Sequence, residues 1–148
     1  MARSDNHHDS NRLAVVTGAS AGVGRATARA FAYRGFDVAL IARGEEGLRA
    51  AASDVEAVGR TALVRAVDVA DAEAVDRAAQ EIEAEQGEID VWVNNAMTTV
   101  FAPIWELSPD DFQRAVEVTF LGQVWGTMAA LARMRPRDRG TIVNVGSA

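Results

Sequence analysis

A glycine-rich segment near the start of the sequence constrains the fold more than any other feature. Gly18, Gly22 and Gly24 lie between a short apolar run, residues 13–16, and an amphipathic pattern. The run has the length of a buried parallel strand, and the pattern is typical of a helix that covers a sheet. The helical spacing predicts that one stripe faces the sheet, while Arg25 and Arg29 stay in water: Val23, Ala26, Thr27, Ala30 and Phe31.

A side chain at each of the three glycines would cause a different steric problem. A side chain there would obstruct the tight turn, the approach of the backbone to phosphate groups, or the contact between helix and strand. Free N–H groups at the start of a helix also favour an anion. The segment therefore predicts a site for a dinucleotide pyrophosphate, with a glycine-rich turn that binds no ligand as the alternative. A Walker-type loop is excluded, because it requires lysine and all 15 residues of the Lys and Arg class are arginine.

Length and composition indicate one soluble domain. The chain has 148 residues, of which 49% are hydrophobic, and residues 12–148 can form one core after a polar, disordered lead-in over residues 1–11. A net charge of -6 argues against nucleic-acid and anionic-membrane partners. We expect no signal peptide, no membrane span, a cytoplasmic location and no metal site, with His7 and His8 solvated. The absence of cysteine excludes disulfides and thiol catalysis.

The middle of the chain alternates between strand and helix patterns. Gly35, Gly59 and Gly87 each stand where a left-handed residue would end a helix. After these glycines we expect strands over residues 36–41, 61–67 and 89–94, with helices over residues 45–58 and 71–86 between the strands. This order predicts an α/β fold, a doubly wound parallel sheet with helices on both faces.

A long helix and a last strand complete the pattern. Ser108 offers an N-cap hydroxyl, Pro109 stands at the first helical position, and acidic residues follow. Apolar residues at helical spacing then predict one continuous helix to about Met134. The β-branched run over residues 141–145 predicts a buried central strand.

Three motifs now occur in a consistent order. They are the TGxxxGxG pattern over residues 17–24, Asn94-Asn95-Ala96 at the end of the fourth strand, and Asn144-Val145-Gly146-Ser147 at the end of the fifth. Together they resemble the short-chain dehydrogenase/reductase family, from Arg12 to the last residue. The resemblance implies a Rossmann fold and an oxidoreductase that moves a hydride between a nicotinamide cofactor and an alcohol or carbonyl substrate.

The resemblance also implies the cofactor site. The glycine loop would cradle the pyrophosphate, Asp68 and Val69 would lie against the adenine, and Asn95 and Ala96 would line a ribose. Asn94 would tie the central sheet together. The implied cofactor-binding residues are Thr17, Gly18, Ser20, Gly22, Val23, Gly24, Arg43, Asp68, Val69, Asn95 and Ala96.

The end of the second strand predicts the choice between NADP and NAD. An acidic residue there would accept hydrogen bonds from the ribose 2′-hydroxyl, but this chain has Ala42-Arg43. An arginine can offer a planar fork to a 2′-phosphate. We therefore expect NADP, with NAD less favoured; the alternative is that Arg43 is only a solvated residue at a strand end.

The resemblance implies catalysis by a serine that holds the substrate oxygen, a tyrosine that transfers the proton, and a lysine that lowers the tyrosine pKa. Ser147 matches the serine, and Thr119 stands where the family usually has an asparagine that supports a water relay. Met97 replaces the usual glycine after Ala96 and adds bulk near the cofactor. Tyr33 is followed four residues later by Asp37, so it cannot replace the family tyrosine.

Three functions remain open at this point. The first is the amino-terminal part of an NADP-dependent oxidoreductase that is inactive as a 148-residue chain alone. The second is a dinucleotide-binding module without catalysis, and the third is an interaction subunit that pairs through the long helix. An unpaired last strand also favours association with a second copy or with another subunit.

Overall fold

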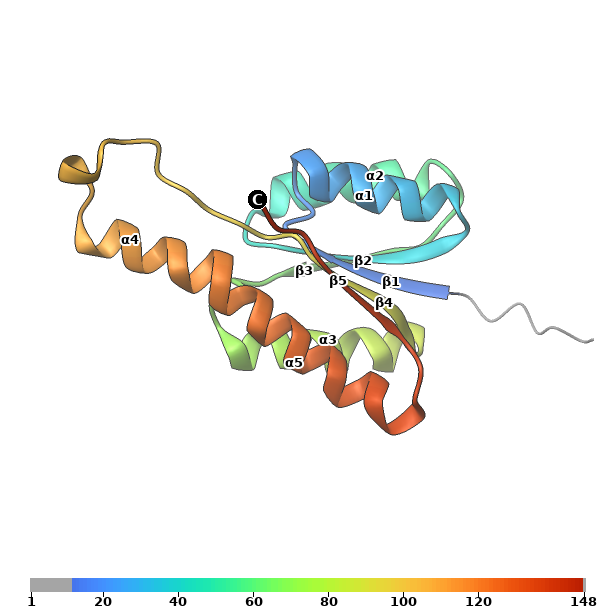
Figure 1. The fold of residues 1–148 in the computed structure, drawn as a ribbon. Coiled ribbons are helices and arrows are strands. Elements are labelled where there is room, and N and C mark those ends of the chain that lie inside the picture. The colour runs from blue at the N-terminus through green and yellow to red at the C-terminus, as the bar shows by residue number, and fades with distance from the viewer. Residues whose placement is uncertain (1–11, 148) are drawn as a thin grey trace, which may run out of the picture.

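The computed structural model describes residues 12–147 (Figure 1). The expectations for residues 1–11, including His7 and His8, lie outside this range. In the described part, five strands form one parallel sheet in the order β3-β2-β1-β4-β5. The strands are β1 Arg12–Thr17, β2 Phe36–Ala42, β3 Ala62–Ala66, β4 Ile89–Asn94 and β5 Thr141–Asn144. The doubly wound α/β prediction is confirmed.

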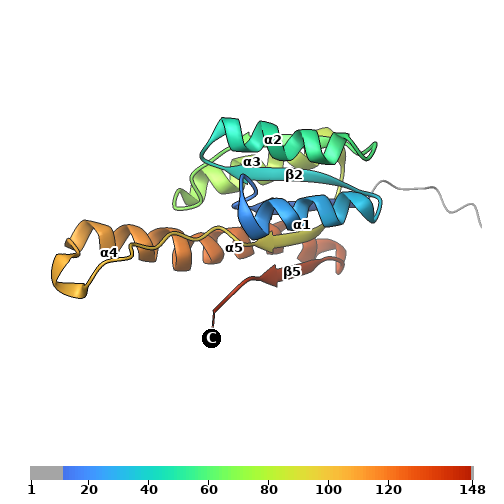
Figure 2. The same ribbon diagram turned by 90° about the horizontal axis from the view of Figure 1, so that it is seen from above.

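Helices cover both faces of the sheet, above and below it in Figure 1, and Figure 2 looks down on the upper face. Helices α1 (Gly22–Tyr33) and α2 (Glu45–Glu56) pack on one face, and α3 (Ala72–Gln86) and α5 (Gly122–Met134) pack on the other. Successive side chains of a strand point to opposite faces, so each central strand contributes to two cores. Leu13 and Val15 thus contact the α3 and α5 side, whereas Val16 contacts the α1 and α2 side.

The face of α1 that packs on the sheet differs from the prediction. The buried residues are Gly24, Ala28 and Ala32, while Val23 is 64% exposed. These small residues follow one another at intervals of four, so they form a stripe that lets the helix backbone approach the strands closely. The predicted stripe was chosen by apolar size, which does not identify a contact made by small side chains.

The predicted long helix is interrupted in its middle. It begins as α4 (Pro109–Val116), continues as a π-helical turn, η2 (Glu117–Leu121), and ends as α5. Before it, residues 95–108, with the short helix η1 (Ile104–Glu106), form an arm that projects away from the sheet (Figure 1). The helix end near Met134 is confirmed, and the helix η3 (Arg135–Arg137) follows it.

The helical region Pro109–Arg137 bears on the expectation that the chain has no membrane span. Among the described residues it is the one helix long and apolar enough to do so, with a mean hydropathy of 1.2 in its best window. Only 28% of that window is buried. The buried part of α5 packs on the sheet through Gly126, Ala129 and Ala130. A helix that packs on a sheet passes the same test of length and composition, so this finding is weak evidence for a membrane span.

Strand β5 lies at the edge of the described sheet rather than in its centre. It pairs only with β4 among residues 12–147, and Val143 is 40% exposed. The expected buried central strand is therefore wrong for the described chain. The β-branched sequence predicted a strand, but only the pairing decides whether a second neighbour covers it.

The start of α4 provides a test of pH dependence. The Ser108 hydroxyl accepts from the Asp111 N–H, and the Ser108 N–H and hydroxyl donate to the Asp111 carboxylate. The side-chain bond, followed by the backbone bond, lowers the pKa of Asp111 below its ordinary value of 3.8. A lowered pKa stabilises the fold above the ordinary value, and this contribution disappears as the pH falls through the folded-state pKa.

We therefore expect Asp111→Asn to reduce the free energy of unfolding more at pH 7 than at pH 3, as measured by urea denaturation. Asp110→Asn is the matched control, because Asp110 lies in the same helical turn but makes no capping bond. Equal losses for Asp111→Asn at both pH values would contradict the assigned role of the carboxylate.

Candidate dinucleotide-binding site

A cavity of about 500 Å³ opens at the carboxyl ends of β1 and β4. These two strands are neighbours, but the chain runs from β1 to β2 and β3 on one side before it crosses to β4 and β5 on the other. Ligands of open α/β sheets bind at such a reversal of strand order. The cavity wall includes nine of the implied cofactor-binding residues: Gly18, Ser20, Gly22, Val23, Arg43, Asp68, Val69, Asn95 and Ala96.

The glycine loop is close to the strand ends because two of its residues lack side chains. Gly18 has a φ of +65°, and a Cβ there would lie 2.8 Å from the Ala96 Cα. A Cβ on Gly24 would overlap the Gly18 carbonyl oxygen and lie 2.5 Å from the Asn95 Nδ2. Gly22 also has a positive φ, of +52°, but has open space around it. Gly18 and Gly24 therefore close the loop onto the sheet, and Gly22 leaves room on the cavity side.

The N-terminus of α1 faces this loop without a side-chain cap. Its N-cap residue, Ala21, offers no acceptor, and the first turn contains no acidic residue. By contrast, Asp71 caps α3 and Ser108 caps α4 with side-chain oxygens. The first N–H groups of α1 are thus left for a ligand, and their partial positive charge favours an anion. This part of the cavity fits a pyrophosphate.

Thr17 and Asn95 lock the loop to the end of β4. The Thr17 hydroxyl accepts from the Asn95 N–H at 3.0 Å and from the Ala96 N–H at 3.1 Å. The Asn95 amide donates to the carbonyls of Thr17 and Gly18, at 3.1 and 3.3 Å. Thr17 and Gly24, the two implied cofactor residues outside the cavity wall, therefore hold that wall in place.

Charged groups meet on another part of the wall. The Asp68 carboxylate accepts from the Ala70 N–H at 3.0 Å and lies 2.8 Å from the Arg114 guanidinium. Partial burial acts to raise the pKa of Asp68, but the Ala70 hydrogen bond, Arg114 and the charge of Arg43 outweigh it and lower the pKa. Asp68 is thus ionised at neutral pH beside two arginines. Arg43 itself is exposed at the end of β2.

Asn94 connects the sheet to α5 beneath the cavity. Its side chain is buried, and its Oδ1 accepts from the Trp92 Nε1 at 2.8 Å. Its Nδ2 donates to the Gln123 carbonyl, the Thr127 hydroxyl and the Asn144 Oδ1. One amide thus joins β4, β5 and α5, which agrees with the role that the resemblance implies for it.

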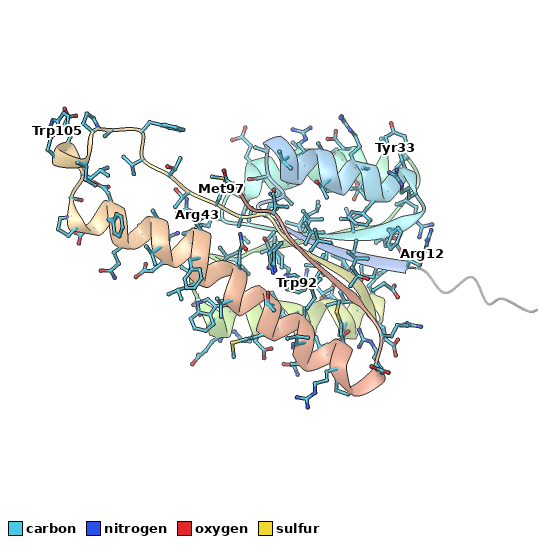
Figure 3. All side chains as sticks on the ribbon, viewed as in Figure 1. Arg12, Tyr33, Arg43, Trp92, Met97 and Trp105 are labelled. Atoms are coloured by element: carbon cyan, nitrogen blue, oxygen red, sulfur yellow. The ribbon has the colours of Figure 1, made fainter. Side chains whose placement is uncertain are left out.

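The two residues with an implied catalytic role differ in their surroundings. Thr119, in the π-helical turn, donates to the Thr98 carbonyl at 2.9 Å and accepts from the Thr98 N–H at 3.0 Å. Ser147 is exposed after β5, close in sequence to Val145 on the cavity wall. Tyr33 is 70% exposed, at the opposite end of the sheet from Arg43 and Met97 (Figure 3).

Several residues of the site had no sequence signal. Val118 and Val145, from distant segments, line the cavity beside Met97, the one residue of the three expected near the cofactor. No sequence pattern predicts Arg114, since its ion pair with Asp68 depends on where α4 lies relative to the segment that follows β3. A strand-end rule could have identified Val145, but no local pattern identifies Arg114.

Comparison with known proteins gives consistent matches. The short chain dehydrogenase family profile matches residues 12–148. The uncharacterized oxidoreductase YxnA of Bacillus subtilis is 36% identical over 138 residues, which are 93% of this chain and 39% of that protein. The curated relatives are longer, and the chain spans about half the length of several of them, for example 57% of a gluconate 5-dehydrogenase from Gluconobacter oxydans.

Solved structures share the fold. A metagenomic short-chain oxidoreductase in complex with NADP has a TM-score of 0.87 and 34% identity, over 93% of this chain and 63% of the other. An NAD+-bound xylitol dehydrogenase has a TM-score of 0.88 and 32% identity, over 94% of this chain and 54% of the other. The neighbours thus include complexes with either dinucleotide.

Proposed function

This chain belongs to the short-chain dehydrogenase family, and we propose that the whole protein is an oxidoreductase that transfers a hydride between NADP(H) and an alcohol or carbonyl substrate. The observation that carries the proposal is the cavity at the strand-order reversal, where the uncapped start of α1 and the exposed Arg43 line the same wall. Both are positive groups in a chain of net charge -6. These positive groups would attract the negatively charged phosphates of a dinucleotide.

Each implied site residue has a role in the proposal. The loop from Gly18 to Gly24 binds the pyrophosphate, with Ser20 and Val23 on its cavity side. Asp68 and Val69 contact the adenine, and Asn95 and Ala96 line a ribose of the cofactor. When bound, the nicotinamide supplies or accepts the hydride. Support comes from the shared cavity wall.

For the substrate end, we propose that Ser147 holds the substrate oxygen. Thr119 fixes the arm to the π-helical turn through its two bonds to Thr98. Tyr33 lies too far away to transfer a proton, so we expect residues 1–148 alone to bind a dinucleotide without turnover. The test is an assay of the full-length gene product beside this 148-residue chain, with a panel of alcohols and carbonyls. Turnover by the short chain would contradict this assignment.

Cofactor choice is tested at Arg43. We expect wild-type protein to bind NADPH more tightly than NADH, and Arg43→Ala to weaken NADPH by about tenfold or more while NADH changes little. A charge-assisted bond to phosphate contributes roughly 1.5–3 kcal/mol, which corresponds to such a factor. Fluorescence titration of the full-length protein gives both dissociation constants.

The matched control for Arg43→Ala is Arg49→Ala. Arg49 is an exposed arginine in α2, whose partner is Glu45 rather than a cavity residue. This control should change neither constant. Equal affinities of wild-type protein for NADPH and NADH would refute the NADP preference.

We also propose that the protein forms a homo-oligomer in the cytoplasm through the exposed side of α4 and α5. Large apolar side chains there are uncovered: Phe112 (60%), Phe120 (64%), Met128 (58%) and Leu131 (47%). Large exposed apolar side chains along one helical region are typical of an interface. We expect Phe120→Asp to raise the dissociation constant of the oligomer at least about tenfold in sedimentation experiments. The reason is that association would bury the new carboxylate in an apolar interface. Tyr33→Asp, a change on exposed α1, should have no effect.

A further inference from the structure

The Arg114–Asp68 ion pair links α4 to the cavity wall. Asp68 lines the cavity, whereas Arg114 does not, and the two charged groups are 2.8 Å apart. Their side chains are 37% and 33% exposed, respectively, so solvent screens them only in part. The contact of Arg114 with the cavity wall is therefore its ion pair with Asp68.

Asp68 has a second cation within electrostatic range. The charge of Arg43 acts on the Asp68 carboxylate. Even so, the ion pair that Asp68 makes is with Arg114, and Arg43 has no ion pair with any residue in the range 12–147. One Asp68 oxygen binds the Ala70 N–H and the other faces Arg114. Both oxygens are thus engaged away from Arg43.

We propose that Arg114 is a positioning residue for cofactor selection: it pairs with the Asp68 carboxylate and balances its negative charge, and thereby leaves Arg43 available for the 2′-phosphate of NADP. The inference rests on the NADP preference proposed above. Without Arg114, the Asp68 carboxylate would attract the Arg43 guanidinium and repel a phosphate bound beside it. Both effects act on the extra charge that NADP carries and NAD lacks.

The test is a double-mutant cycle in the full-length protein, with the ratio of the NADH to the NADPH dissociation constant as its readout. We expect Arg114→Gln to lower this ratio about fivefold, in the range of coupling between neighbouring charges. Asp68→Asn added to Arg114→Gln should restore the ratio, because the unpaired carboxylate is gone. Arg114→Lys should keep most of the preference, because it retains the positive charge.

The cycle separates a local charge effect from a general structural one. A damaged α4 would weaken both dinucleotides equally and leave the ratio unchanged, and Asp68→Asn would not repair it. Arg133→Gln is the matched control, because it removes another 2.8 Å ion pair, with Asp76, from the same helical region. It should leave the ratio unchanged.

The test distinguishes a failure of the role of Arg114 from a failure of the NADP preference. An unchanged ratio in Arg114→Gln, or no recovery in the double variant, overturns the role of Arg114 while the NADP preference stands. A wild-type protein that binds both dinucleotides equally overturns the proposed preference, and the role of Arg114 with it.

Discussion

Gly24→Ala is expected to lower the free energy of unfolding by about 2 kcal/mol and to weaken dinucleotide binding at least about tenfold. Two effects oppose each other at this position. Alanine is the better helix former by about 1 kcal/mol, which favours the variant. The new Cβ, however, overlaps the Gly18 carbonyl and lies 2.5 Å from the Asn95 Nδ2. Because the overlap involves backbone, the helix start must move, and the overlap outweighs the propensity gain.

Chemical denaturation and NADPH titration measure the two effects of Gly24→Ala. Ala26→Gly is the control, since Ala26 is exposed on the same helix and its loss changes only helix propensity. The control should cost about 1 kcal/mol and leave binding intact. If Gly24→Ala bound NADPH like the wild type, the close contact of α1 with the loop would not matter for the site.

Asn94→Leu is expected to destabilise the fold by about 3 kcal/mol. Leucine keeps the approximate shape but neither donates nor accepts a hydrogen bond. The buried Trp92 Nε1 would then lose its acceptor, and the Thr127 hydroxyl and the Asn144 Oδ1 would lose their donor. Unsatisfied buried groups cost roughly 1–3 kcal/mol each, and the more exposed partners recover part of this by binding water.

Thermal and urea unfolding of Asn94→Leu test this expectation. Gln113→Leu is a suitable comparison, because it removes an exposed hydrogen bond from the Gln113 amide to Glu117. We expect it to cost less than about 0.5 kcal/mol. If Asn94→Leu were as stable as wild type, the amide would not link β4, β5 and α5 energetically.

Much of the fold could be predicted from local sequence alone. The strand β4 begins and ends where the pattern indicated, and the other helix and strand boundaries lie within a few residues of their predicted places. Glycines at Gly35, Gly59 and Gly87 have positive φ values, as predicted for helix ends. These features follow from neighbours in the sequence: apolar periodicity, capping side chains and glycine conformations.

The candidate site was predictable to the extent that strand ends define it. In a parallel sheet, the carboxyl ends of the strands lie on one edge, so the residues after β1, β2, β3 and β4 had to converge there. The grouping of Gly18, Arg43, Asp68 and Asn95 around one cavity follows from this. Titration of the variants with NADPH and NADH measures their roles in binding.

The sequence by itself therefore determined the alternation of strands and helices, their ends, and the residues at the cavity edge. Only the tertiary structure decided that α1 packs through Gly24, Ala28 and Ala32, that β5 lies at an edge, and that Arg114 contacts Asp68. Local patterns depend on interactions over a few residues. Which small residues meet a sheet, and which charges pair across the fold, depend on the distances between elements that are far apart in the chain.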